Sequence, residues 1–344
     1  MELPFDLSDV FFITTANTLD TIPRPLLDRM EVIELSSYTD EEKLQIAKRH
    51  LLPKEMKRHG LGKGQLKVTD DAIREMIASY TRESGVRVLE RKLAGICRKA
   101  AMKLVAGEIT CVRVSPKDLK EYLGVAHYHP EREALKERVG VVNGLAWTSV
   151  GGELLEVEVN VVPGTGKVEL TGNLGDVMKE SASAALSFIR SRTAQLGVDP
   201  DFYKNNDLHV HFPEGAVPKD GPSAGIAITT AMVSALTGTP VRPGIAMTGE
   251  VTLRGRVLAI GGLREKTMAA KRSGIKTVII PAENEKDLEE IDQTVRASLQ
   301  FILAEHVDQV LAQALPAGKL ARQEILPDNG QQLHESRNTA RLKQ

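Results

Sequence analysis

A serine lies where a short turn leads into an apolar helix. Residues 218–225 read PKDGPSAG, and the apolar run at 223–236 predicts a helix that begins at Ser223. Unpaired N–H groups at a helix start stabilise negative charge, including a tetrahedral oxyanion. Ser223 is therefore a candidate nucleophile, and its own amide and those near Asp220 or Gly221 are candidate oxyanion donors. The alternative is a serine that only caps the helix.

The motif GPSAG also matches the nucleophile elbow of the α/β-hydrolases. That elbow requires a strand that runs directly into the turn, but a loop separates Ser223 from the predicted strand that ends near Phe212. It also requires an acid and then a histidine after the serine, and the histidines after Ser223 are His306 and His334. The pattern therefore does not favour an α/β-hydrolase.

Without a histidine, a lysine can serve as the base if it is neutral. A neutral lysine requires a dry site or nearby positive charge. Lys266 is the best candidate, because the other face of its predicted helix is apolar. Thr248, in the segment AMTGE, could donate a hydrogen bond to the amine and orient it. The alternatives are a solvated surface lysine and an ordinary turn threonine.

Other motifs carry less chemistry. The GTGK at 164–167 lacks the first glycine and the final Ser/Thr of a P-loop, and no complete P-loop occurs in the sequence. His127 with His129 and His209 with His211 are spaced so that each pair would share one strand face, but no further ligands complete a metal site. We therefore predict neither a nucleotide cradle nor a metal site from these residues.

Composition limits the class of protein. The chain has 344 residues, enough for roughly two domains. Its net charge of −1 makes a poor match for nucleic acid, and no apolar stretch approaches the 18 residues typical of a membrane span. The start is acidic where a signal peptide is basic. Cys97 and Cys111 form no CxxC pair, so we expect a cytoplasmic protein without a disulfide or zinc framework.

The elements that must position these residues fall into several parts. Residues 1–38 predict a strand (10–16), a helix (18–30) and a strand (31–35), too little for a domain. Residues 39–124 predict a helical bundle, 125–136 a linker, and 318–344 a disordered tail. In this bundle we expect a first helix from Thr39 to Pro53, which begins with a capping box between Thr39 and Glu42. A second helix begins at Asp70, a third covers 85–107, and a short fourth runs from Pro116 to Gly124.

Residues 137–317 alternate between strand and helix patterns and predict a mixed α/β domain. The expected strands are 153–162, 167–171, 207–212, 277–280 and 299–303, with a hairpin over 250–260. The expected helices are 175–196, 223–236, 263–273, an acidic one from Glu283, and 306–315.

The sequence resembles the C-terminal part of the bacterial ATP-dependent Lon proteases, of the LonA type. The resemblance covers nearly the whole chain to about residue 315. It rests on the segments VFFITTANTLDTIPRPLLDRMEVIEL, YTDEEKLQIAKRHLLP, ESGVRVLERKLAGICRKA, GLAWTSVGGELL, HVHFPEGAVPKDGPSAGIA, AMTGEVTLRGRVLAIGGLREK and GIKTVIIP.

The resemblance implies a role for several residues. Ser223 matches the family's nucleophile, Lys266 its general base, and Thr248 the hydroxyl that supports the lysine. Asp220 matches an aspartate that borders and gates the oxyanion site. Three residues match parts of the AAA+ nucleotide site: sensor 1 (Asn17), the arginine finger (Arg29) and sensor 2 (Arg87).

The resemblance also implies an α+β multidomain fold. We expect an AAA+ large-domain remnant, a helical AAA+ small domain, and a mixed α/β protease domain like the second domain of ribosomal protein S5. The Walker motifs of the family would precede residue 1, so binding of ATP or ADP with Mg to this chain alone is in doubt. The implied activity is a serine endopeptidase in protein quality control that cleaves unfolded proteins with a Ser–Lys dyad, and the implied assembly is a homohexamer.

Two other functions stay open. One is a catalytically silent AAA+ module that only regulates a partner in a ring. The other is weak DNA binding by basic clusters of the helical part, for which a solvated helix face is the alternative. The residues of these clusters are Lys54, Lys57, Arg58, Arg91, Lys92, Arg98 and Lys99.

Overall fold

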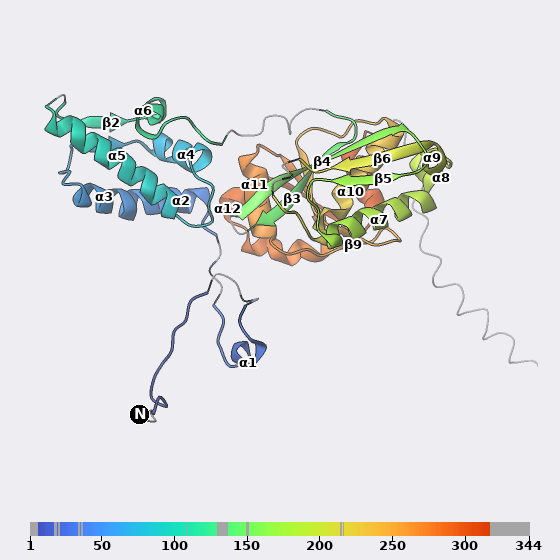
Figure 1. The fold of residues 1–344 in the computed structure, drawn as a ribbon, viewed down its shortest axis with the longest axis horizontal. Coiled ribbons are helices and arrows are strands. Elements are labelled where there is room, and N and C mark those ends of the chain that lie inside the picture. Colours follow the sequence, from blue (N-terminus) through green and yellow to red (C-terminus); the bar gives the residue numbers. More distant parts are fainter. Residues whose placement is uncertain are drawn as a thin grey trace, which may run out of the picture. The chain divides into compact units, whose positions relative to one another are not determined.

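The computed structural model of the chain describes residues 6–16, 19, 21–33, 35, 37–107, 109–128, 137–148, 151–213, 215 and 217–316. The chain divides into two units, Met1–Ser36 and Ser37–Gln344. Figure 1 shows their helices and strands. The sensor-1 candidate Asn17, most of the predicted linker and the predicted tail lie outside the described residues.

The described part of the N-terminal unit contains one short helix and no strand. Helix α1 (Arg24–Leu27) has Pro25 in its first turn, where the missing N–H is not needed. The strands predicted at 10–16 and 31–35 are wrong for this structure, and the helix predicted over 18–30 is reduced to one turn. A strand requires a neighbouring strand for its backbone hydrogen bonds, and no described residue of the unit supplies one. The side chains of Phe11 and Ile13 are accordingly exposed.

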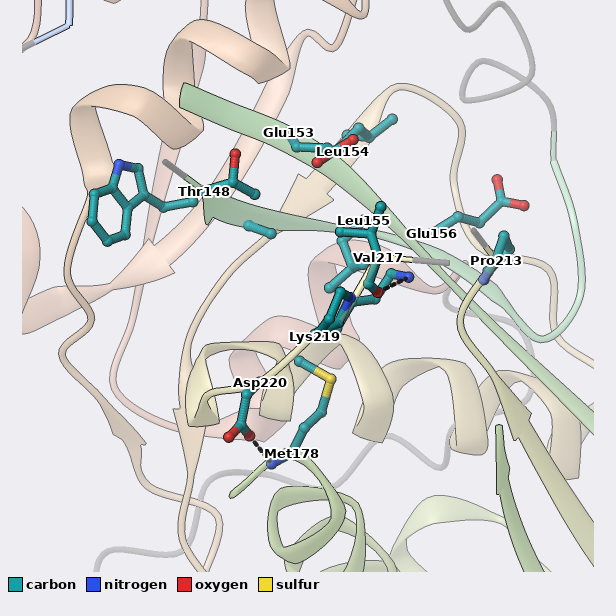
Figure 2. A pocket seen from close by; sticks show the side chains of 13 residues that line it. Thr148, Glu153, Leu154, Leu155, Glu156, Met178, Pro213, Val217, Lys219 and Asp220 are labelled. Atoms are coloured by element: carbon teal, nitrogen blue, oxygen red, sulfur yellow. Dashed lines mark hydrogen bonds between the residues drawn. The ribbon is translucent and has the colours of Figure 1, made fainter. Parts of the chain in front are cut away.

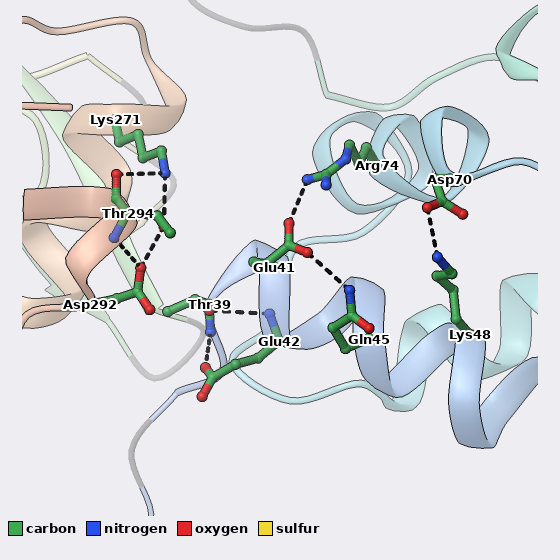
Figure 3. Close-up of polar contacts among 10 residues, drawn as sticks. All are labelled: Thr39, Glu41, Glu42, Gln45, Lys48, Asp70, Arg74, Lys271, Asp292 and Thr294. Atoms are coloured by element: carbon green, nitrogen blue, oxygen red, sulfur yellow. Dashed lines mark hydrogen bonds and ion pairs between the residues drawn. The ribbon is translucent and has the colours of Figure 1, made fainter. Parts of the chain in front are cut away.

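Residues 37–128 are mostly helical. The first helix begins with the predicted capping box, in which the Thr39 hydroxyl accepts from the Glu42 amide (3.2 Å) and the Glu42 carboxylate accepts from the Thr39 amide (2.7 Å; Figure 3). Leu44, Ile73 and Leu93 belong to one shared apolar core. The helical elements are α2 (Asp40–Ile46), the π-helical η1 (Ala47–Leu51), α3 (Leu52–Arg58), α4 (Asp70–Ser79), α5 (Arg87–Val105), the 3-10 turn η2 (Pro116–Asp118) and α6 (Leu119–Leu123).

The first helix does not end at Pro53, as the sequence pattern predicts. The chain stays helical to Arg58. Proline cannot donate to the carbonyl four residues before it, and its ring clashes with that carbonyl. The turn before Pro53 is the π-helical η1, which is wider than an α-turn. The widened turn accommodates the proline, so the helix continues.

A small parallel sheet in this helical part was not predicted. Strand β1 (Leu66–Val68) pairs with β2 (Val112–Val114) and adds valine side chains to the same core. Each strand has three residues, which is too short for an alternating pattern to stand out in the sequence.

Residues 137–316 are built on a mixed seven-stranded sheet, which confirms the predicted mixed α/β architecture of this region. The strand order is β11-β10-β7-β3-β4-β6-β5. Strand β4 is antiparallel to β3 and β6, and the other neighbours are parallel. The strands are β3 (Val141–Thr148), β4 (Gly151–Pro163), β5 (Val168–Thr171), β6 (Asn206–His211), β7 (Ile245–Met247), β10 (Thr277–Pro281) and β11 (Gln300–Ala304), with a separate hairpin of β8 (Glu250–Val251) and β9 (Val257–Leu258).

Helices cover both faces of this sheet. Met247 of β7 packs in the core with α7, α10 and α13, whereas its neighbour Ala246 packs on the opposite face with α11, α12 and η5. The helices are α7 (Asp176–Ser191), α8 (Thr193–Leu196), α9 (Phe202–Asn205), the 3-10 turn η4 (Pro222–Ala224), α10 (Gly225–Thr237), α11 (Leu263–Arg272), the 3-10 segment η5 (Ala282–Glu290), α12 (Gln293–Arg296) and α13 (Val307–Ala314).

Two helix predictions in this region need correction. The helix predicted over 175–196 breaks at Arg192, whose φ of −134° is not helical. The acidic helix predicted from Glu283 is the 3-10 segment η5. No helix in the described ranges is both long and apolar enough to span a bilayer.

Candidate active site

Ser223 lies in a 3-10 turn that leads directly into α10. The turn is η4, and Gly221 before it has a φ of +114°, a conformation that favours glycine. From Gly225 to Ser234 every residue of α10 is buried. Ser223 itself is half-buried and lies just before the N-terminus of this helix. The serine is therefore held at the start of a buried apolar helix and is itself only partly buried.

The backbone carbonyl of Ser223 is held from the end of β7. It accepts hydrogen bonds from the Thr248 hydroxyl (3.2 Å) and from the Gly249 amide (2.9 Å). The structure thus brings Ser223 and Thr248 together. Gly249 was not singled out in the sequence, because a residue that acts through its backbone amide leaves no side-chain signal.

The Asp220 carboxylate binds two backbone amides beside Ser223. Its carboxylate accepts from the Met178 amide in the first turn of α7 (3.0 Å; Figure 2) and from the Gly221 amide (2.8 Å). Gly175 lies against this carboxylate, since a Cβ there would come within 2.2 Å of it. The Gly221 amide, one of the candidate oxyanion donors, is therefore already occupied by Asp220 in this structure.

Lys266 lies in the first half of α11, and its side chain is 3% exposed. Burial lowers the pKa of its ammonium to about 8. No hydrogen bond or ion pair joins its amine to any residue in the described ranges. The side chain therefore has the dry surroundings that a neutral lysine requires.

The helix that carries Lys266 (α11) and the helix that follows Ser223 (α10) pack on opposite faces of strand β7. Ala246 of β7 packs with Leu263 and Met268 of α11, whereas Met247 packs with α10, which follows Ser223. Thr248 comes directly after β7. No hydrogen bond links Lys266 to Ser223 or Thr248 in the described structure, so the contact predicted between threonine and lysine stays a prediction.

A cavity of about 350 Å³ adjoins the segment that leads into Ser223 (Figure 2). Trp147, the chain's one tryptophan, lies at this cavity and is 62% exposed. The cavity is lined by Ala146, Trp147, Thr148, Glu153, Leu154, Leu155, Glu156, Met178, Pro213, Val217, Pro218, Lys219 and Asp220. Its mixed apolar and polar wall could hold part of an extended chain beside the serine.

The GTGK segment forms an anion cradle, but the anion is a side chain of the protein. The Asp207 carboxylate accepts from the amides of Thr165 (2.8 Å), Gly166 (3.0 Å) and Lys167 (2.8 Å). These hydrogen bonds, that of Lys167 first, hold the pKa of Asp207 below its usual value. The cradle therefore does not fit a nucleotide phosphate.

The remaining predicted residues are distributed over both units. Arg29 in the N-terminal unit and Arg87 at the start of α5 are both exposed. His209 and His211 share a strand face and lie 2.8 and 2.7 Å from the Thr171 hydroxyl. Across the described ranges, no group of three or more His, Cys, Asp or Glu side chains is arranged to hold a metal ion.

Family models match most of the chain. The model for the Lon protease (S16) C-terminal proteolytic domain matches residues 113–317, and that for the Lon protease AAA+ ATPase lid domain matches residues 57–112. The helical core nevertheless extends beyond the lid match, because Val114 and Tyr122 pack with it.

Proteins named Lon protease are similar over nearly the whole chain. That of Desulforamulus reducens is 58% identical over 92% of this chain and 39% of its own length. That of Brevibacillus choshinensis is 57% identical over 92% and 40%, and Lon protease 1 of Bacillus subtilis is 56% identical over 93% and 41%. The chain thus spans about two fifths of the length of these curated relatives.

Proposed function

The chain belongs to the Lon protease family, and on that premise we propose that it cleaves peptide bonds as a serine endopeptidase. Ser223 is the nucleophile and Lys266 its general base. The observation that carries this proposal is the burial of Lys266 without an acidic partner. With a pKa of about 8, about a tenth of the amine is neutral at pH 7, against roughly one part in three thousand for an ordinary lysine.

The proposed reaction has two halves. In the first, neutral Lys266 takes the proton of the Ser223 hydroxyl while its oxygen attacks the scissile carbonyl. The amides of Ser223 and Gly221 stabilise the oxyanion, and the Lys266 ammonium then protonates the leaving amine. In the second half, Lys266 activates a water molecule that hydrolyses the acyl-enzyme.

Asp220 gates this reaction in our proposal. Its carboxylate occupies the Gly221 amide and caps α7 through Met178. An oxyanion near Gly221 would compete with that carboxylate for the same donor and be repelled by its charge. We therefore propose that Asp220 moves away from Gly221 when a substrate binds.

The family also suggests the substrates, the assembly and the location of the protein. We propose unfolded proteins as substrates, a homohexamer as the assembly and the cytoplasm as the location, in keeping with the family. We further propose that residues 1–38 belong to an AAA+ large domain and that the sheet region has the fold of the second domain of ribosomal protein S5. The GTGK segment has no part in nucleotide binding in this proposal, because Asp207 occupies its amides. Arg29 and Arg87 stay candidates for contact with ATP or ADP.

The two alternative functions lack a specific supporting observation. In the basic clusters, Lys54 pairs with Glu90 (2.7 Å) and Arg58 lies 3.7 Å from Glu55. Lys99 donates to the Glu121 carbonyl. These contacts are ordinary for a solvated helix face. A silent regulatory module would not explain why a lysine is buried without a partner.

The test is cleavage of an unstructured protein such as casein in the absence of nucleotide. Ser223→Ala should lower the rate on the order of 10⁶-fold, to background, because no other group replaces the nucleophile. Ser183→Ala, which changes an exposed serine of α7, is the matched control and should cleave like the parent.

A peptide boronate provides a second readout, since it forms a tetrahedral adduct with a nucleophilic serine. The parent and Ser183→Ala should form the adduct and Ser223→Ala should not. Parental cleavage by Ser223→Ala, or the absence of both cleavage and adduct in the parent, would refute the proposal.

A further inference from the structure

Asn284 makes an unusual pair of contacts with one backbone residue. Its side-chain oxygen accepts from the Ile260 amide (3.0 Å), and its side-chain nitrogen donates to the Ile260 carbonyl (2.9 Å). The same nitrogen donates to the Asp287 carboxylate (2.5 Å), which fixes the orientation of the amide. Asn284 is 2% exposed, so these bonds are protected from water. One side chain thus pairs with Ile260 as a neighbouring strand would.

Ile260 lies three residues before the first residue of α11, the helix that carries Lys266. Gly261 and Gly262 follow it, and Gly262 adopts a left-handed conformation (φ 69°, ψ 30°) at the N-cap of α11. As the N-cap residue, Gly262 has no side chain with which to cap this helix. The Lys266 amide makes its helical bond to the Gly262 carbonyl (3.1 Å). Two glycines permit many chain directions, and the clamp on Ile260 limits the directions from which they can lead into α11.

The first turn of α11 has little freedom to readjust. A Cβ at Gly152 of β4 would lie 1.8 Å from the Glu265 carbonyl oxygen, so strand and helix touch backbone to backbone. A Cβ at Gly262 would lie 3.1 Å from the Cβ of Trp147. With such close packing, a displaced helix start moves the first turn as a unit.

The amine of Lys266 depends on this placement. No hydrogen bond to a described residue holds it, so the backbone of α11 and the packing around the buried side chain together place the amine. We infer that Asn284 is a positioning residue for the general base, acting through Ile260 and the start of α11. This inference rests on the proposed function, in which Lys266 is that base.

The test compares Asn284→Asp with the parent in peptide cleavage over pH 6 to 10. Aspartate keeps the size and the acceptor but cannot donate to the Ile260 carbonyl, and it repels Asp287. We expect kcat to fall roughly 10- to 100-fold, as for a misplaced catalytic group, with KM unchanged. The midpoint of the kcat–pH profile should rise, because a loosened helix start admits water to the ammonium. Asn160→Asp adds the same charge at an exposed position of β4 and should behave like the parent.

A milder variant covers the case in which Asn284→Asp does not fold, judged by circular dichroism. Asp287→Ala keeps the clamp but removes the group that orients it, and it should lower kcat by roughly 3- to 10-fold, with the same direction of midpoint shift. Asp287→Asn keeps an acceptor for Asn284 and should restore most of the loss.

Lys266→Met, measured beside these variants, separates this inference from the proposed function. If Lys266→Met is inactive while folded Asn284→Asp, or Asp287→Ala in its place, keeps the parental kcat and midpoint, the inference fails alone. If Lys266→Met cleaves like the parent, the proposed base is wrong and the inference fails with it.

Discussion

Lys43 of α2 and Lys266 of α11 are both buried lysines, 4% and 3% exposed. They differ in what surrounds the amine. The Lys43 amine donates to the Glu83 carbonyl at 2.5 Å. Burial lowers the pKa of Lys43, and the charge of Arg272 adds to this shift, while the charges of Asp40 and Glu83 oppose it. For Lys266 burial acts alone and lowers the pKa to about 8.

The hydrogen bonds around Lys43 join α2 to the start of α5. The Glu83 carboxylate accepts from the amides of Val88 and Leu89 (2.8 Å each), so it caps the start of α5. The Lys43 amine binds the backbone carbonyl of the same residue and so ties α2 to this cap. An ammonium with an acceptor and nearby carboxylates is stabilised in its charged form. Burial by itself therefore does not distinguish the two lysines, whereas burial without partners is what supports the proposed role of Lys266.

The largest expected difference between the two lysines is in cleavage rate. Lys266→Met should lower casein cleavage by roughly 10²- to 10⁴-fold, the usual contribution of a general base. Lys43→Met, the same substitution at the other buried lysine, should leave the rate at the parental level. Equal losses in both variants would mean that Lys266 matters only for folding.

The second difference concerns pH. Below the Lys266 pKa of about 8 only the neutral fraction of the amine can accept a proton, so kcat should rise roughly tenfold per pH unit and level off above pH 8. The Lys43→Met variant should keep this midpoint. A profile of the parent that is flat between pH 6 and 8 would show that a different group is the base.

The smallest expected difference is in stability, and its sign should be opposite at the two sites. At pH 7 Lys266→Met removes a buried, unpaired ammonium and should raise the free energy of unfolding by about 1–3 kcal/mol. Lys43→Met leaves the Glu83 carbonyl without its donor and should lower it by about 1 kcal/mol. Urea unfolding followed by Trp147 fluorescence reports on the sheet region, and circular dichroism follows the helical part.

The stability gain of Lys266→Met should itself depend on pH. Between about pH 8 and 10.5 the unfolded parent still binds the lysine proton while the folded parent has lost it, so the stability of the parent rises with pH. The gain over the parent should therefore shrink as the pH rises through this window. A gain that stays constant from pH 7 to 10.5 would contradict the depressed pKa.

Local sequence predicts the elements around the site well. The apolar run of α10, the hairpin of β8 and β9, and the amphipathic α11 form close to their predicted positions, although α10 begins at Gly225 and Ser223 lies in the 3-10 turn before it. The same reasoning fails at 10–16, where an apolar, β-branched run forms no strand. A strand depends on a partner that its own residues do not encode. It also fails at Pro53, where a π-helical turn absorbs the proline.

The sequence by itself determined which residues could do chemistry here: a serine at the start of an apolar helix, a lysine without a nearby histidine to replace it, and a threonine after a strand. Only the tertiary structure decided that Lys266 is buried without a partner, that Thr248 bonds to the Ser223 carbonyl, and that Asp220 occupies the Gly221 amide. The sequence gives the type of each residue, but the burial of a side chain and the partners of a backbone amide depend on groups that are far apart in sequence. The pKa of a side chain is set by those groups, so it can be determined only once the fold has placed them.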